Sequence, residues 1–128
     1  MARVSSAGVA DYAEVPAKLV ARVRAICLAL PETYEEKAWV GTRWRIRKRT
    51  FAHAIGVDGV DIVVFRSEPP ELDVLREAGH PYFYAGWGRD VVGIVIDEKT
   101  DWGEVAELMT DSYCVMAPKK LRAQVESA

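Results

Sequence analysis

Arginine occupies every second position from residue 43 to residue 49, and Trp44 and Ile46 stand between the first three arginines. A period of two is the repeat of a β-strand, in which successive side chains point to opposite faces. The pattern therefore predicts a strand with one guanidinium face and one apolar face, with a turn near residues 47–49. We call residues 41–51 the basic strip.

Two further strands are predicted after the basic strip, from about Thr50 to Val57 and from Val60 to Arg66. Asp58-Gly59 lies between them and is typical of a two-residue hairpin turn that needs positive φ. With the strip, these segments predict a three-stranded antiparallel meander. A fourth strand is expected from Val91 to Ile96, where the sequence is apolar enough for burial on both faces.

Helical spacing and capping signals predict four helices. Apolar residues repeat at helical spacing between Pro16 and Pro31, and a short helix is expected from the Pro69-Pro70 pair to Gly79. Asp101 and Glu104 have the spacing of a capping box, and Pro118 separates the helix that they begin from a last one. The order of helix, meander, helix, strand and two helices predicts an α+β fold.

The length of 128 residues, half of them hydrophobic, suits one globular domain. We expect a flexible N-terminus over residues 1–15 and a single domain over residues 16–128. Cys27 and Cys114 are expected to be buried thiols rather than a disulfide. The chain shows neither the apolar core of a signal peptide nor the roughly 20 apolar residues of a membrane span, so we expect a cytoplasmic protein without a membrane role.

Positive charge is concentrated in the basic strip. The net charge is −2, yet residues 37–57 hold six Lys or Arg and no Asp or Glu, which leaves −8 on the remainder. An acidic body with one basic segment is poorly suited to coat nucleic acid indiscriminately, but it can present a local anion site. Because the arginine fork pairs with phosphate, the candidate phosphate contacts are Arg43, Arg45, Arg47, Lys48 and Arg49. Three or four such contacts predict a slope of log K against log salt of about −3 to −4.

Other interpretations of the strip remain open. The arginines can pair with the chain's own Glu32, Glu35 and Glu36, or form a solvated edge strand that charge protects against aggregation. The same side chains can also bind a small anion or a protein partner. The position of the guanidinium groups, either in solvent or folded back on the glutamates, distinguishes these possibilities.

An aromatic segment with several glycines precedes the fourth strand. Tyr82, Tyr84 and Trp87, with Arg89, can stack nucleobases or line a small-molecule pocket. Trp87 stands between two glycines, which favours an exposed turn. The other three tryptophans are assigned to packing: Trp39, Trp44 and Trp102.

Motifs for catalysis, metals and cofactors are not evident. The segment from Gly86 to Val91 lacks the third glycine of the dinucleotide fingerprint and precedes a strand. The cysteines and histidines are not at ligand spacing, and the serines lack a flanking nucleophile signature. We therefore expect a protein that is not an enzyme and that holds neither metal nor cofactor.

Several short strings resemble, in their order and spacing, those of the MmcQ/YjbR family. They are Cys27-Leu28-Ala29-Leu30-Pro31-Glu32, Trp39, Trp44-Arg45-Ile46, Arg49-x-Phe51-Ala52, Asp101-Trp102, Ser112-Tyr113 and Pro118-Lys119-Lys120-Leu121. The resemblance covers roughly residues 16–122. Val40, Thr42 and Arg49 depart from it, because the family often has Gly, Pro and Lys there.

The resemblance implies the double-wing fold of that family, which is commonly labelled DNA-binding. Combined with the basic strip, it leads to the hypothesis of DNA binding through the basic hairpin. Trp87 and Arg89 would then contact bases or sugars. The alternative is a module for a small anion or a protein partner, without a nucleic-acid role.

Overall fold

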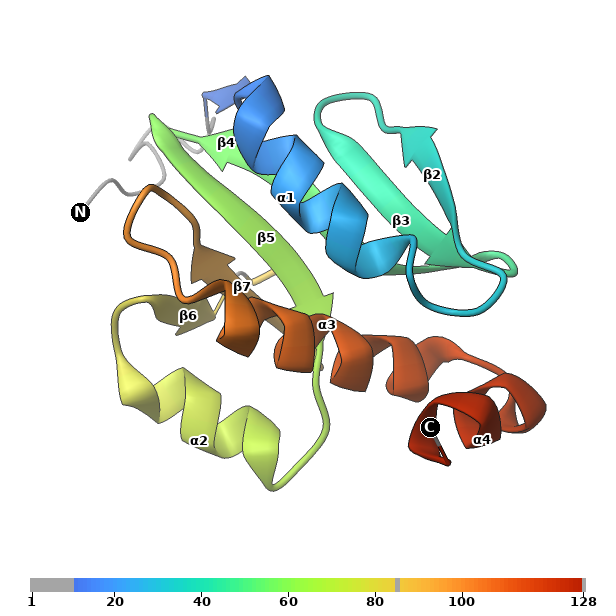
Figure 1. Cartoon of the computed structure of the whole chain (residues 1–128). Coiled ribbons are helices and arrows are strands. Elements are labelled where there is room, and N and C mark those ends of the chain that lie inside the picture. The colour runs from blue at the N-terminus through green and yellow to red at the C-terminus, as the bar shows by residue number, and fades with distance from the viewer. Residues whose placement is uncertain (1–10, 85, 128) are drawn as a thin grey trace.

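The computed structural model describes residues 11–84 and 86–127 (Figure 1). Four helices occur in these residues: α1 (Ala17–Cys27), α2 (Glu71–Ala78), α3 (Trp102–Met116) and α4 (Lys119–Glu126). The strands are β1 (Tyr12–Ala13), β2 (Tyr34–Lys37), β3 (Thr42–Ile46), β4 (Arg49–Val57), β5 (Val60–Arg66), β6 (Tyr82–Tyr84) and β7 (Val91–Val95).

All strands belong to one antiparallel sheet with the order β2-β3-β4-β5-β7-β6, and β1 pairs with β4. The predicted α+β class and the β3–β5 meander are confirmed. Asp58 and Gly59 have φ values of 50° and 84°, as the predicted hairpin turn requires. The capping prediction is also confirmed, because the Asp101 side chain accepts a hydrogen bond from the backbone N–H of Glu104.

Three strands were not predicted from the sequence: β1, β2 and β6. Residues 34–37 and 82–84 form short strands at the two edges of the sheet, and neither has the alternating apolar residues that would predict a strand. The prediction of a flexible terminus is wrong for residues 11–15, since Tyr12 and Ala13 pair with β4 and Val15 is buried. Its remaining part, residues 1–10, lies outside the described residues.

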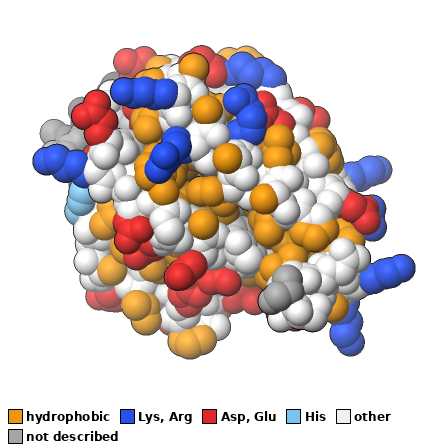
Figure 2. Space-filling view, viewed as in Figure 1, with side chains coloured by type: hydrophobic (Ala, Val, Ile, Leu, Met, Phe, Trp, Pro, Cys, Tyr) orange, Lys and Arg blue, Asp and Glu red, His pale blue; other side chains and the backbone are white. Residues whose placement is uncertain are grey.

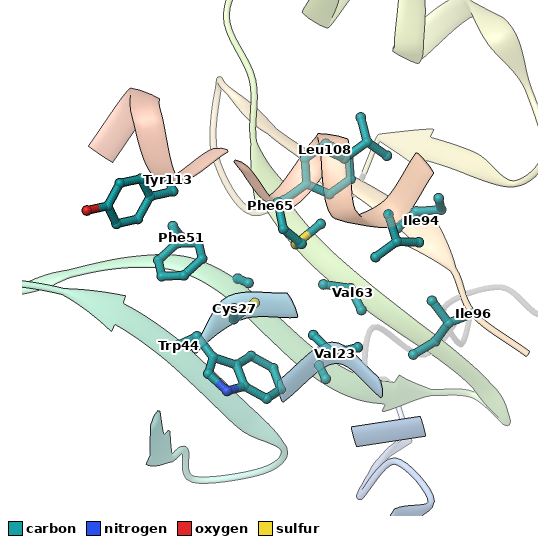
Figure 3. Close-up of a cluster of buried hydrophobic side chains, with 14 of the residues drawn as sticks. Val23, Cys27, Trp44, Phe51, Val63, Phe65, Ile94, Ile96, Leu108 and Tyr113 are labelled. Atoms are coloured by element: carbon teal, nitrogen blue, oxygen red, sulfur yellow. The ribbon is translucent and has the colours of Figure 1, made fainter. Parts of the chain in front are cut away.

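Side chains from α1, α3 and one face of the sheet form the main core (Figure 3). Phe51 of β4 and Tyr113 of α3 meet edge to face, with ring centroids 5.6 Å apart. Trp44 is fully buried, which confirms its assignment to packing. The same assignment is wrong for Trp39, which is 94% exposed.

The helices lie on one side of the sheet (Figure 1). On that side, basic, acidic and hydrophobic side chains are interspersed on the surface (Figure 2). We call the opposite side of the sheet the open face, because no helix of the described residues packs on it. It carries a smaller apolar cluster of Ile55, Ile62, Val64 and Val91.

Both cysteines are free thiols; Cys27 is buried and Cys114 is half-buried. Burial raises the pKa of each thiol above its ordinary value. In the described part of the chain, every helix is too short or too polar to cross a membrane.

Candidate ligand-binding face

The basic strip divides its side chains between the two faces of the sheet. In β3, Thr42, Trp44 and Ile46 are buried toward the helices, whereas Arg43 and Arg45 are half-buried on the open face. The predicted alternation of guanidinium and apolar faces is confirmed over this strand.

The alternation does not continue to Arg47 and Arg49. The strand ends at Ile46, and Arg47 has a φ of 56° in the turn that reverses the chain. Arg49 is the cross-strand partner of Ile46, so its side chain leaves the sheet on the helical side. The expectation of one guanidinium face across four arginines is therefore wrong, because only Arg43 and Arg45 share the open face.

Glu36 of β2 pairs with both of these arginines and offsets one of their two positive charges. Arg43 is its direct cross-strand partner and donates from Nε to Glu36 Oε1 at 2.6 Å, and Nη2 donates to the same oxygen. Arg45 Nη1 lies 3.5 Å from that oxygen. These contacts, that of Arg43 first, lower the pKa of Glu36, which keeps the carboxylate charged at neutral pH.

The hairpin tip is partly neutralised as well. Arg47 Nη1 donates to Glu32 Oε1 at 2.8 Å, and Arg45 Nη2 donates to the backbone carbonyl of Lys48 at 2.5 Å. Lys48 and Arg49 are exposed and form no ion pair within the described residues. The pairing of arginines with the chain's own glutamates, which the sequence left open, is therefore present at Arg43, Arg45 and Arg47.

Glu35 has a different partner. Arg24 of α1 binds its carboxylate with both Nε and Nη2, at 2.7 and 3.0 Å. The indole N–H of Trp44 also donates to Glu35, at 3.0 Å. Glu35 thus fixes α1 and the buried indole, and it contributes no charge to the open face because it lies on the helical side with Trp44.

A cavity of about 200 Å³ opens on the open face between β3, β4, β5 and the turn that carries Trp87. Arg43, His53, Arg66 and Trp87 line it together with apolar side chains that include Val64. Arg66 Nη1 is 3.4 Å from Asp90 Oδ1, at the limit of a hydrogen bond. Two guanidinium groups, an imidazole and an indole thus surround one cavity.

His53 connects the cavity to the neighbouring turn. Its Nε2 is 2.9 Å from the carbonyl oxygen of Val40, and because a carbonyl only accepts, Nε2 carries the proton. Burial lowers the pKa of His53, and the charges of Arg43 and Lys37 lower it further. The ring is therefore neutral at pH 7.

Trp87 is 44% exposed, in agreement with the predicted exposed turn. Its ring centroid lies 6.3 Å from that of Tyr12 and 6.4 Å from that of His53. Arg89 is exposed, and its backbone carbonyl accepts a hydrogen bond from Arg76. Of the residues proposed as contacts from the sequence, Arg43 and Trp87 line the cavity. The others do not line it: Arg45, Arg47, Lys48, Arg49 and Arg89.

Trp39 projects from the turn between β2 and β3, and several contacts hold this turn. Glu14 accepts from Lys37 Nζ at 2.5 Å and from the backbone N–H of Gly41 at 2.9 Å. Gly41 has a φ of 84°, and a Cβ there would be 2.2 Å from the carbonyl oxygen of Ala54. The turn is therefore closely packed while its indole stands in solvent.

His53 and Arg66 also line the cavity, and the sequence did not identify them as site residues. The period of two that places Val60, Ile62 and Val64 on one face extends to Arg66, so this residue could have been found. His53 could not be identified in this way. Its place beside Arg43 depends on the register of β3 and β4, which makes the two residues cross-strand partners. Among the described residues, no group of three or more His, Cys, Asp or Glu side chains could hold a metal ion.

Comparison with known proteins supports the resemblance seen in the sequence. The model of the YjbR family matches residues 28–115, which include β2 to β7 and most of α3. No curated protein matches the chain. The matched region is more than half of the chain and contains the cavity residues, so this protein belongs to the YjbR family.

Proposed function

We propose that this domain binds single-stranded nucleic acid on the open face, with one nucleotide in the cavity beside Trp87. The observation that supports this proposal is the grouping of an exposed indole with Arg43 and Arg66 around one cavity. An indole stacks on any nucleobase, and guanidinium groups bind phosphate. A nucleotide carries both a base for the indole and a phosphate for the guanidinium groups.

Lys48, exposed in the turn of the basic hairpin, would contact a neighbouring phosphate, whereas Arg49 leaves the sheet on the helical side. The contribution of Arg43, Arg45 and Arg47 is smaller than their number suggests, because Glu36 and Glu32 already offset two of their three positive charges. For a single strand, each neutralised phosphate changes the slope of log K against log salt by about −0.7. One phosphate held in the cavity and one at Lys48 give a slope of about −1 to −2, which is shallower than a ladder of free arginines would give.

A second candidate is a small anionic molecule with a ring, bound in the same cavity without any nucleic-acid role. The pairing of Arg43, Arg45 and Arg47 with glutamates favours it, because it leaves little continuous positive surface for a phosphate backbone. The two candidates share the cavity and differ in whether the hairpin tip contributes to binding.

Fluorescence anisotropy with labelled single- and double-stranded DNA, at two salt concentrations, tests the proposal. We expect binding of the single strand that Trp87→Ala or Arg66→Ala weakens about tenfold or more. Tyr84→Ala and Lys120→Ala serve as matched controls, because they remove an exposed ring and a positive charge from outside the cavity. Flat titrations at low salt with folded protein would refute the nucleic-acid proposal.

Thermal unfolding with nucleoside monophosphates and inorganic phosphate separates the two candidates. A ligand that binds only the folded state raises Tm. A rise in Tm with a monophosphate that Arg66→Ala removes, without any affinity for oligonucleotides, would favour the small-anion candidate.

A further inference from the structure

Ser112 is a buried serine of α3 whose hydroxyl joins two strands of the sheet. Its Oγ donates to the carbonyl oxygen of Phe51 at 2.5 Å and accepts from the backbone N–H of Arg66 at 2.8 Å. Phe51 belongs to β4 and Arg66 is the last residue of β5. The hydroxyl is completely buried and both of its hydrogen bonds are to backbone groups.

This hydroxyl occupies the place of a bond between the two strands. The register of β4 and β5 runs from Val57 opposite Val60 to Ala52 opposite Phe65, so Phe51 would next face Arg66. In a regular antiparallel ladder the N–H of one residue of such a pair bonds directly to the carbonyl of the other. Here the Ser112 hydroxyl bonds to both backbone groups instead, at 2.5 Å to the carbonyl of Phe51 and 2.8 Å to the N–H of Arg66, and the ladder of paired residues ends at Ala52 and Phe65.

The irregularity continues into β3. The register between β3 and β4 shifts between Trp44 and Arg45, so that Thr50 rather than Phe51 faces Arg45. Phe51 consequently turns into the core against Tyr113, while Thr50 joins the lining of the cavity. Bulges of this kind redirect side chains and are frequent beside functional sites.

The cavity lies beside this end of the β4–β5 ladder, because Phe51, Phe65 and Arg66 all contribute to its lining. We propose that Ser112 is a positioning residue for this cavity: its hydroxyl separates the end of β5 from β4 and fixes the backbone from which Arg66 projects. The inference rests on the proposed function for the ligand, but the geometry that it assigns to Ser112 can be tested without one.

Ser112→Ala removes the bridge and leaves a buried N–H and a buried carbonyl without their partner. We expect the Arg66 amide to exchange about tenfold faster or more in ¹H/²H exchange, because it loses a buried hydrogen bond. We also expect the NMR signals of the Trp87 indole N–H and the His53 ring to shift, and the affinity for the single-stranded probe to fall about tenfold.

Thr110→Ala is the matched control. Thr110 lies two residues earlier on α3, and within the described residues its hydroxyl bonds only to the carbonyl of Ala106 in the same helix. The Thr110→Ala variant should leave the exchange rate of the Arg66 amide and the NMR signals of Trp87 and His53 unchanged. Ser112→Cys introduces a somewhat larger thiol that donates and accepts only weakly, so it should give a smaller change in the same direction. This variant keeps the test available if the alanine variant does not fold.

Unchanged exchange at Arg66 and unchanged Trp87 and His53 signals in both Ser112 variants would overturn the inference. If these signals change as expected while the wild-type protein binds no oligonucleotide, the positioning role stands and the proposed function fails. If the wild type binds and the Ser112 variants bind equally well, the cavity does not depend on this hydroxyl and the inference is wrong.

Discussion

Arg43 and Glu36 are direct partners across β2 and β3, and two nitrogens of the guanidinium group donate to one carboxylate oxygen. Because Arg45 approaches the same oxygen, a single glutamate offsets part of the charge of both β3 arginines on the open face, where Arg66 of β5 also lies. Glu36 thereby limits how strongly this face attracts anions.

Glu36→Gln should increase the affinity for single-stranded DNA. Removal of the carboxylate strengthens the contact of Arg43 with phosphate and frees Arg45 for a new one, so the slope of log K against log salt should steepen by about 0.7. Anisotropy titrations at several salt concentrations measure this slope. Glu98→Gln is the matched control, because Glu98 forms an exposed ion pair with Lys18 of α1. An equal gain in both variants would mean that net charge alone, and not the Arg43–Glu36 pair, determines affinity.

His53 should make the protein less stable in mild acid. Its pKa is lowered in the folded state, so the unfolded chain takes up a proton at a higher pH than the folded chain does. The free energy of unfolding should therefore fall as the pH drops below about 6.5, the ordinary pKa of histidine. Urea unfolding at pH 7 and pH 5.5 measures the change. His53→Gln, which can keep a donor toward Val40, should remove most of it; an unaltered pH dependence in this variant would contradict the assignment.

Acid destabilisation from the carboxylates should appear separately, at lower pH. Lys37 lowers the pKa of Glu14 and Arg24 lowers that of Glu35, each chiefly through a hydrogen bond to the carboxylate. Their contribution to stability is complete above pH 4.5 and is lost as the pH falls through their folded pKa values. An unfolding series from pH 5 to pH 3 should show this second decline in His53→Gln as well as in the wild type.

Trp39 and Trp44 should differ sharply in their effect on stability. Trp39→Ala removes a side chain that is almost fully exposed, so the free energy of unfolding should change by no more than about 0.5 kcal/mol. Trp44→Ala empties a fully buried site and removes the bond to Glu35, which should destabilise the protein by about 3–5 kcal/mol. Urea unfolding of both variants measures the difference, and a large loss in Trp39→Ala would mean that its ring is packed.

Gly41→Ala should destabilise the protein more than Gly59→Ala. Both glycines have a φ of 84°, which costs an alanine about 1–2 kcal/mol. A Cβ at Gly59 meets no atom within 4 Å, whereas one at Gly41 meets the carbonyl oxygen of Ala54 at 2.2 Å. This clash should add about 1–3 kcal/mol. Equal losses in the two variants would show that the turn moves away from β4 without penalty.

Local patterns were sufficient to predict the elements that are regular in sequence. The alternation in β3 and β5, the Asp58-Gly59 turn and the Asp101 cap depend on residues close together in the chain, and each is found in the structure. The edge strands β2 and β6 are too short and too irregular in polarity for such a pattern, and their pairing with β3 and β7 determines them.

The candidate site depends on contacts that the sequence does not encode locally. Pairing of Glu36 with Arg43 requires β2 to be a strand in a particular register. Contact between His53 and Trp87 requires that the turn before β7 returns to β4, across 34 positions of the chain. The sequence thus indicated the basic and aromatic segments but not which of their side chains meet.

The turn that carries Trp39 has a consequence for association. Lys37, Gly41 and their contacts with Glu14 fix the backbone on both sides of the indole when the chain folds. A partner that stacks on this ring therefore meets a surface that is already in place and loses little affinity to restricting its motion. The backbone that carries the exposed Trp39 ring is thus already restrained in the folded protein before any partner binds.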